Sequence, residues 1–343
     1  MLISEFDYHL PPELIAQEPL AERARSRMLV VDRKARGFRD EKFTAFPQFL
    51  HSGDVLVLNN TKVFPARLFG RTESGANVEI FLVRREENAV WETLARPARR
   101  LRPGKRITFD KRLAAEVIEK TDDGKVVLSF DADGDLDRTI DEIGRTPLPP
   151  YIKRDGSAID ADRERYQTVF ARNRGAIAAP TAGLHFTPAI LDEIRDTGAA
   201  IAEVTLHVGY GTFEPVRVEN VDEHRVMPEI YEIDAGAADV LNSAKSERRR
   251  IVAVGTTTTR ALEHNAATFD GFTTGEHSAD LTITPGYRFG AVDVMLTNFH
   301  LPQSSLLVLV STFAGHELIM RAYEHAVAER YRFYSYGDCM LIV

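Results

Sequence analysis

The chain has 343 residues, a length that allows a sizeable core and about two domains. Hydrophobic residues make up 44% and charged residues 27% of it, which excludes an intrinsically disordered chain, and the net charge of −8 excludes a strongly basic coat protein. A nucleic-acid partner stays open, because binding needs only a local basic patch.

The cysteine and histidine content indicates a reducing compartment and no structural metal. Cys339 is the single cysteine, so no intramolecular disulfide can form, and the sequence has neither a CxxC pair nor an HExxH motif. The N-terminus lacks the basic and apolar regions of a signal peptide. The longest apolar stretches, near 305–314, are shorter than the ~20 residues that span a bilayer. We therefore expect a cytoplasmic protein.

Residues 1–62 are predicted to be mixed α/β. Pro11 and Pro12 favour the first turn of a short helix, which Pro19 would end. Segment 54–60, DVLVLNN, is a continuous apolar run that becomes polar at its end. This pattern is typical of a strand that is buried on both faces of a parallel sheet.

Residues 65 to about 148 change to short alternating runs, separated by turn signals such as ESGAN and TDDGK. No helical period runs through this stretch. Six short strands with hairpin spacing predict a small antiparallel barrel or sandwich. The prolines at 147, 149 and 150 indicate an exit linker.

Strands and helices alternate from residue 151 to residue 343, which favours a mostly parallel sheet covered by helices. We therefore predict an α/β domain formed by residues 1–63 and 150–343, with a small antiparallel β-barrel domain inserted at 64–149. Helices are predicted over 188–198, 237–250, 257–268, 304–315 and 316–330, and strands over 199–208, 251–255, 291–299 and 331–343.

Polar loops follow four of the predicted strands. Ligands of open α/β sheets bind beyond the carboxyl ends of the strands, and parallel strands bring those ends to one edge. Any one loop could be only a helix cap, but all four together predict a site. The loops are Asn59 to Lys62, His207 to Thr212, Thr256 to Arg260, and Asn298 to Pro302, and the loop before the helix at 188 adds Thr181 and His185.

Three loop histidines, His185, His207 and His300, are the predicted catalytic residues, because imidazole exchanges protons near neutral pH. Arg260 and the turn at 256–259 offer a guanidinium and free backbone N–H groups to a carboxylate or a phosphate. No GxSxG, Walker A or GxGxxG motif points to a serine nucleophile, a nucleoside triphosphate or NAD. The predicted substrate contacts are Asn60, Thr61, Thr181, Tyr210, Thr256, Thr257, Arg260 and Asn298, with Phe213 as a second ring that could stack on a base or belong to the core.

A basic run at 96–112 holds eight Lys or Arg residues against one acid, Asp110. It is either a solvated hairpin or a surface that follows a phosphate backbone. The predicted RNA contacts are Arg99, Arg100, Arg102, Lys105 and Arg106.

Long segments of the chain, among them LNNTKVFPARLFGR, GAIAAPTAGLHFT, VTLHVGYGTFEPV, AVGTTTTRALE and LTNFHLPQSSLLVLVSTFAG, closely resemble the S-adenosylmethionine:tRNA ribosyltransferase-isomerase family of queuosine biosynthesis. The resemblance runs from residue 1 to residue 343. It implies transfer and isomerisation of the ribosyl part of S-adenosylmethionine onto 7-aminomethyl-7-deazaguanine at the tRNA wobble position. The product would be epoxyqueuosine tRNA, with adenine and methionine released. The resemblance also implies a metal-free monomer with a barrel inserted into an α/β domain.

The sequence departs from the pattern of that family in three segments. Gly75, Ala76 and Asn77 replace a Gly-Gly-Lys-like turn, and Lys62 stands where arginine is common, which keeps the charge but loses the planar fork. The stretch Asp-His-x-Met-His-x-Glu appears here as residues 223–229, with Met227 at the second histidine.

The implied chemistry needs proton transfer rather than a covalent nucleophile. The sulfonium makes the C5′ protons acidic, so a base must remove one, an acid must help adenine to leave, and the attacking amine must be neutral. Two other classes remain open. An RNA methyltransferase would use the same donor, but the GxGxG-type loop of the common methyltransferase fold is missing. A non-catalytic RNA-binding protein would leave the polar loops unexplained.

Overall fold

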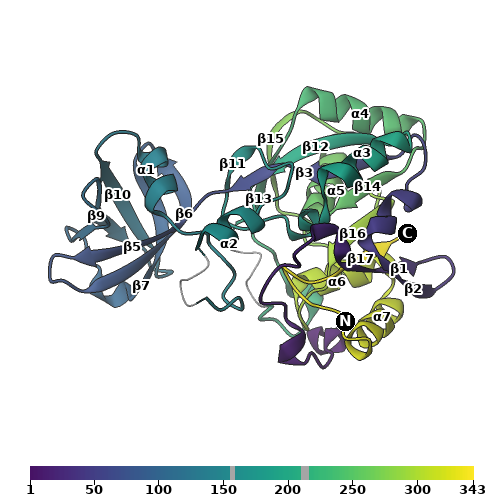
Figure 1. The fold of residues 1–343 in the computed structure, drawn as a ribbon, viewed down its shortest axis with the longest axis horizontal. Coiled ribbons are helices and arrows are strands. Elements are labelled where there is room, and N and C mark those ends of the chain that lie inside the picture. Colours follow the sequence, from purple (N-terminus) through teal and green to yellow (C-terminus); the bar gives the residue numbers. More distant parts are fainter. Residues whose placement is uncertain (155–158, 210–215) are drawn as a thin grey trace.

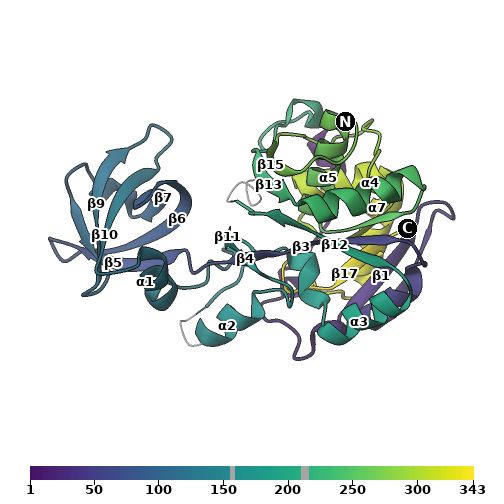
Figure 2. The same ribbon diagram turned by 90° about the horizontal axis from the view of Figure 1, so that it is seen from above.

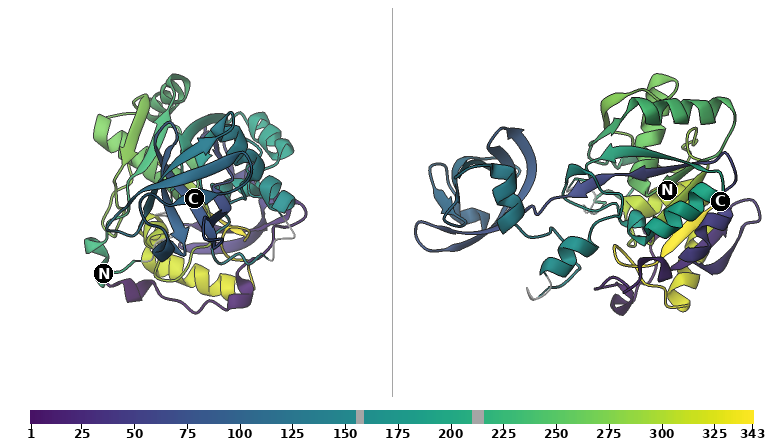
Figure 3. Two further views of the ribbon diagram at one scale, coloured as in Figure 1. Left: turned by 90° about the vertical axis from the view of Figure 1, so that its left-hand side faces the viewer. Right: turned by 45° about the horizontal axis from the view of Figure 1, so that its top comes forward.

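The computed structural model describes residues 1–154, 159–209 and 216–343, which form a large sheet covered by helices and, beside it, a closed barrel (Figure 1). The predicted fold class is therefore confirmed. Figure 3 (left) looks onto the barrel with the sheet behind it, and its right-hand view shows the two parts side by side.

The large sheet has nine strands in the described residues, in the order β15-β13-β12-β3-β14-β16-β17-β1-β2. Its four central strands run parallel to one another. They are β12 (Ala200–Leu206), β3 (Val55–Asn59), β14 (Ile251–Val254) and β16 (Val294–Asn298). All five residues of β3 are buried between β12 and β14, so the prediction of a strand buried on both faces is confirmed.

The outer strands are mostly antiparallel to their neighbours and were less visible in the sequence. The last strand, β17 (Cys339–Ile342), is much shorter than the predicted 331–343 and lies antiparallel to β16. It pairs in parallel with β1 (Arg27–Asp32), which forms a hairpin with β2 (Gly37–Lys42). At the other edge, β13 (Glu229–Ile233) and β15 (Gly275–Ala279) pair antiparallel.

Two apolar layers cover the two faces of the sheet. Val55 and Val57 of β3 belong to one core cluster, while Leu56 and Leu58 belong to the other, because successive side chains of a strand point to opposite faces. The predicted helices are present as α3 (Pro188–Asp196), α4 (Ala235–Ser246), α5 (Thr256–Phe269), α6 (Ser305–Ala314) and α7 (His316–Ala328).

Local signals explain where several helices begin. Thr187 caps α3 by accepting a hydrogen bond from the Ile190 N–H, 3.3 Å away, with Pro188 in the first turn. The two N-terminal prolines open only the 3-10 turn η2 (Pro12–Leu14), so the prediction that this helix continues to Pro19 was wrong. Within the described residues, no single helix is long and apolar enough to cross a membrane. Only α6 and α7 taken together are long and apolar enough for a membrane span, and the two helices meet at a bend of 117°.

The barrel closes in the order β10-β7-β6-β5-β8-β9, and all of its strand pairs are antiparallel. The predicted six-stranded barrel is thus confirmed. The short helix α1 (Leu136–Ile143) follows the last strand, and the absence of a helix from this stretch was a wrong prediction. Leu136, Ile140 and Ile143 have the i, i+4, i+7 spacing of a helix face and pack on the barrel core, but the period lasts only two turns. The strands are β5 (Arg67–Thr72), β6 (Asn77–Glu87), β7 (Val90–Arg96), β8 (Arg106–Thr108), β9 (Leu113–Lys120) and β10 (Val126–Ala132).

A short parallel ribbon lies between the barrel and the large sheet. It pairs β4 (Thr61–Val63), which directly follows β3, with β11 (Asn173–Ala176). Helix α2 (Ile159–Arg165) precedes β11 along the chain. The ribbon therefore carries the polar residues after β3 toward the end of β12, where His207 lies.

Candidate active site

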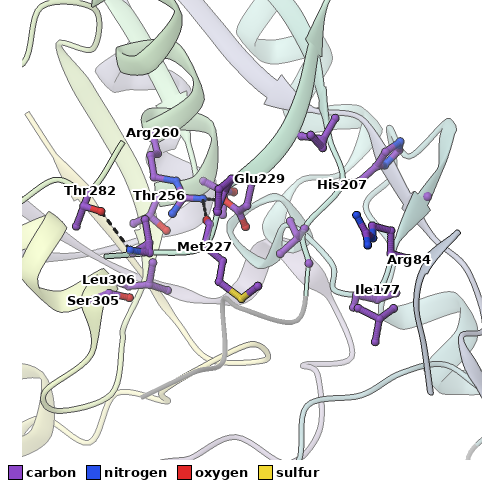
Figure 4. Close-up of a pocket in the computed structure, with 18 of the residues that line it drawn as sticks. Arg84, Ile177, His207, Met227, Glu229, Thr256, Arg260, Thr282, Ser305 and Leu306 are labelled. Carbon is purple, nitrogen blue, oxygen red and sulfur yellow. Dashed lines mark hydrogen bonds and ion pairs between the residues drawn. The ribbon is translucent and has the colours of Figure 1, made fainter. Parts of the chain in front are cut away.

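A cavity of about 1190 Å³ lies between the carboxyl edge of the large sheet and the barrel. Its walls come from β6 and β7 of the barrel, from the ends of β11 and β12, from the first turn of α5, and from α6. Figure 4 shows His207 and Arg84 at one end of this cavity and Arg260, Thr256 and Glu229 toward the other. The sheet edge that was predicted to hold the site therefore borders a cavity, and the barrel forms part of the wall of that cavity.

His207 is the predicted catalytic histidine that lines this large cavity. Its Nδ1 atom lies 2.7 Å from Oγ1 of Thr61, whose hydroxyl also has the carbonyl oxygen of Asn173 as an acceptor at 3.4 Å. Thr61 can therefore accept from Nδ1–H, which leaves a lone pair on Nε2. Burial lowers the pKa of His207, although Glu276 and Glu232 oppose the shift. The ring is consequently neutral near pH 7 and able to accept a proton.

Gly175 of β11 makes room for this imidazole. A Cβ atom at Gly175 would lie 2.5 Å from Cε1 of His207, closer than real Cβ atoms come to any neighbour. The glycine is therefore required by the position of His207 rather than by its own backbone angles.

His185 lies elsewhere, in the 3-10 turn η6 (Thr181–His185), and is only 4% exposed. Its Nε2 atom lies 2.9 Å from Oδ1 of Asn298, and its Nδ1 atom 2.8 Å from Oγ of Ser26. The Asn298 amide nitrogen donates to the carbonyl oxygens of Tyr334 and Ser335, so its oxygen must face the imidazole. Nε2 therefore carries the hydrogen, and Nδ1 accepts from Ser26. Burial lowers the pKa of His185 to about 4, which keeps the ring neutral.

A second, smaller cavity of about 90 Å³ collects most of the other predicted loop residues. It shares Val208, Thr256, Thr257 and Leu306 with the large cavity, so the two are neighbours. His300 lines it, with Nε2 2.9 Å from Oγ1 of Thr297, and burial lowers the pKa of His300 to about 3. The predicted residues in its wall are Thr181, Thr256, Thr257, Asn298 and His300.

The first turn of α5 faces both cavities. Gly255 precedes it with a φ of 98° and no side chain caps the helix, so the first backbone N–H groups stay open to a ligand. Arg260, one turn later, is already engaged: Nη2 forms a buried ion pair with Glu229 and donates to the carbonyl oxygen of Met227 at 3.3 Å. Its Nε atom has no hydrogen-bond partner among the described residues.

The remaining predicted contacts divide into three groups. Asn60 is buried in a polar network: its amide nitrogen donates to Glu203, and its oxygen accepts from Thr205 and Asn173. It lines neither of the two cavities. Thr61 is buried and acts through His207, whereas Tyr210 and Phe213 lie outside the described residues.

At the positions that depart from the family pattern, Met227 is 49% exposed on the wall of the large cavity, and His224 lines the same wall. Burial lowers the pKa of His224, and the charge of Arg225 adds to the shift. Lys62 is exposed on β4.

The predicted RNA contacts are exposed on the barrel, and none of them is among the residues that line the large cavity. Arg106 forms an ion pair with Asp131 at 2.8 Å, whereas the other four form no ion pair within the described ranges. The barrel residues that do line the cavity were missed. The arginine pair that ends the alternating run NVEIFLVRR was the available signal. These residues include Arg84, Arg85, Trp91, Glu92 and Lys125.

Comparison with known proteins shows the family of the chain. Residues 3–342 match the family described as queuosine biosynthesis protein. The chain belongs to this family. It is 51% identical over 344 residues to the S-adenosylmethionine:tRNA ribosyltransferase-isomerase of Geobacter sulfurreducens and 52% identical over 363 residues to that of Solibacter usitatus, each alignment covering both chains completely. A solved structure of S-adenosylmethionine tRNA ribosyltransferase from Thermotoga maritima is 38% identical with a TM-score of 0.56, and covers 99% of this chain and 100% of its own. The resemblance seen in the sequence is therefore confirmed.

Proposed function

We propose that the two neighbouring cavities are the place where this chain performs the reaction of its family. The chain is an S-adenosylmethionine:tRNA ribosyltransferase-isomerase of queuosine biosynthesis. It transfers and isomerises the ribosyl group of S-adenosylmethionine onto the 7-aminomethyl-7-deazaguanine base at the tRNA wobble position, which forms epoxyqueuosine in the tRNA. Adenine and methionine leave in this reaction.

His207 is our candidate for the base that accepts the C5′ proton. The observation that carries this assignment is its position: a neutral imidazole on the wall of the large cavity, with Nδ1 held by Thr61 and Nε2 left to act. A positioned general base contributes roughly 10²–10⁴ to a rate. Thr61 acts here by holding the ring rather than by touching the donor.

The open N-terminal turn of α5 is our candidate for the donor carboxylate. The backbone N–H groups of Thr256 and Thr257 meet both cavities, and the positive end of the helix dipole favours an anion there. Because Glu229 already holds Nη2 of Arg260, we assign that guanidinium mainly to fixing the wall, and Nη1 has no partner among the described residues.

The smaller cavity is our candidate for the ribosyl hydroxyls and the polar edge of adenine. Thr181, Asn298 and His300 supply hydroxyl, amide and imidazole groups to its wall. His185 supports this wall from behind, since it binds Asn298, lines neither the large nor the smaller cavity, and borders a separate cavity of about 30 Å³. We therefore assign His185 a positioning role, and His300 a binding role in neutral form.

Several coarser features are proposals of the same kind. The division into a domain of residues 1–63 and 150–343 and an inserted domain of residues 64–149 follows the strand connections. A metal-free reaction is proposed from the family resemblance. A cytoplasmic monomer is proposed from the family resemblance alone.

The test of the base is the variant His207→Gln, compared with His51→Gln, which changes an exposed histidine outside both cavities. We expect kcat to fall by at least roughly 10²-fold in the first variant and to stay within twofold in the second. Folding is checked by circular dichroism. Unchanged turnover in His207→Gln would remove this residue from the chemistry.

Labelled S-adenosylmethionine distinguishes the proposed reaction from a methyltransferase and from a protein that only binds RNA. Ribosyl carbons labelled in S-adenosylmethionine should move to the tRNA, and a labelled methyl group should leave with methionine. Transfer of the methyl label would instead identify a methyltransferase, and transfer of neither label would favour a protein that only binds RNA.

A further inference from the structure

The outer face of β5, β6 and β7 continues from the large cavity along the barrel. Alternate residues of these strands are buried in the barrel core, so the others point outward. Val83 of β6 and Leu94 of β7 point outward into the cavity wall. Figure 2 shows β6 and β7 on the side of the barrel that faces the large sheet, with β9 and β10 on the far side. A ligand in the cavity can therefore extend onto this face.

An exposed aromatic ring lies further along the same face. Phe69 of β5 is 45% exposed, and the guanidinium of Arg145 lies over its ring at 4.7 Å from the ring centre. Phe69 pairs across the strands with Glu79, which pairs in turn with Arg96 of β7. Arg71 follows Phe69 by two residues and so points to the same face. The guanidinium of Arg145 thus lies on the ring, and Arg71 and Arg96 lie on the same outer face.

The acids of this face are already paired. Arg67 holds Glu79 at 2.5 Å, and Lys125 holds Glu92 at 3.1 Å with Arg84 at 3.6 Å on its other oxygen. Three exposed arginines are left that form no ion pair within the described parts of the chain: Arg71, Arg96 and Arg145. A protein with a net charge of −8 therefore concentrates unpaired positive charge around one exposed aromatic ring.

The far side of the barrel offers a contrast. Ile118 of β9 is 50% exposed, about as much as Phe69, but its exposed neighbours along the strand, Glu116, Glu119 and Lys120, carry charges of both signs. Charges of mixed sign do not concentrate positive charge around the side chain. The basic aromatic surface is therefore a property of one face of the barrel, and that face adjoins the cavity.

We propose that Phe69, Arg71, Arg96 and Arg145 form an RNA-binding platform for the anticodon arm of the tRNA. An unpaired base stacks on Phe69, and the three arginines hold the neighbouring phosphates, which is how proteins grip single-stranded loops. This proposal rests on the proposed function, because it takes the adjoining cavity as the place where the wobble base reacts. The basic run at 96–112 begins on the platform at Arg96, so Arg99 and Arg100 extend it around the end of the barrel.

The test measures binding of an anticodon stem-loop RNA to the full-length chain by fluorescence anisotropy at several salt concentrations. Phe69→Ser should raise the Kd about 5- to 100-fold, the loss expected for one stacked base. Its matched control is Ile118→Ser, which should stay within twofold. The triple variant Arg71→Gln, Arg96→Gln, Arg145→Gln should reduce the slope of log K against log salt by roughly 2. The charge-matched control Lys111→Gln, Lys120→Gln, Arg138→Gln should leave the slope unchanged.

Steady-state kinetics give the second measurement. The platform variants should raise KM for tRNA, with kcat at saturating tRNA and KM for S-adenosylmethionine unchanged. Wild-type RNA affinity in both platform variants would overturn the proposal, and so would an equal loss in the two control variants. A wrong assignment of the cavity would give a different result from a wrong assignment of the platform. In that case His207→Gln would keep a normal kcat, while the platform variants would still bind RNA weakly.

Discussion

The Nε2 atom of His185 lies 2.9 Å from Oδ1 of Asn298, and this contact joins a buried turn to the end of a central strand. His185 belongs to η6, whereas Asn298 ends β16, so 113 positions separate them in the sequence. The amide nitrogen of Asn298 binds the chain at Tyr334 and Ser335. A single side chain thereby ties three segments together behind the smaller cavity.

Asn298→Ala should destabilise the protein and damage the smaller cavity together. The change leaves the Nε2–H of His185 and two carbonyl oxygens without their partner, and each unsatisfied buried group costs about 1–3 kcal/mol. Urea unfolding should show a lower free energy of unfolding by at least that amount, and KM for S-adenosylmethionine should rise. The exposed polar variant Asn88→Ala, on the barrel, is the control for both measurements.

Neutral His185 should make stability depend on pH. Its pKa in the folded protein is about 4, below the ~6.5 of an unfolded histidine, so the unfolded chain binds more protons between these values. The contribution is fully present above about pH 6.5 and is lost as the pH falls toward 4, about 3 kcal/mol in all. Urea unfolding between pH 7.5 and pH 4.5 should show this loss, and His185→Gln should show a smaller one. Equal slopes in the two proteins would contradict the assignment of a neutral ring.

Much of the fold was predictable because its central strands are continuous apolar runs and its barrel strands alternate. The antiparallel strand β13, next to the edge strand β15, escaped notice because it has only five residues and follows a proline-containing loop. The partners of the site residues were not predictable in the same way. His207 and Thr61 are 146 positions apart, and Arg260 and Glu229 are 31 apart.

The sequence also could not say which side of the barrel faces the sheet, because every strand of a barrel has one outward face. The basic run at 96–112 was conspicuous as a run of charges. Arg71, Arg96 and Arg145 come from separate segments and meet around Phe69 only after the barrel closes. Spatial clusters of this kind carry no signature along the chain.

Gly175→Ala should impair catalysis with little effect on stability. The added Cβ would lie 2.5 Å from the His207 ring, which must turn away from Thr61 to make room. We expect kcat to fall by at least tenfold, because misplacing a general base removes most of its effect. Gly290→Ala is the control, since a Cβ there has nothing within 4 Å and Gly290 lines neither of the two cavities. Equal activity in the two variants would show that the ring position is not important for turnover.

Variants of the buried ion pair between Arg260 and Glu229 distinguish a structural role of Arg260 from a role in binding. Removing one partner of such a pair leaves a buried charge and costs about 3–5 kcal/mol, whereas replacing both by apolar residues is often neutral. Arg260→Met and Glu229→Leu should therefore each lower the free energy of unfolding, and the double variant should recover most of the loss. If the guanidinium also binds the donor carboxylate through Nη1, the double variant should regain stability but keep a raised KM for S-adenosylmethionine. Recovery of both quantities would assign Arg260 to the wall of the cavity alone.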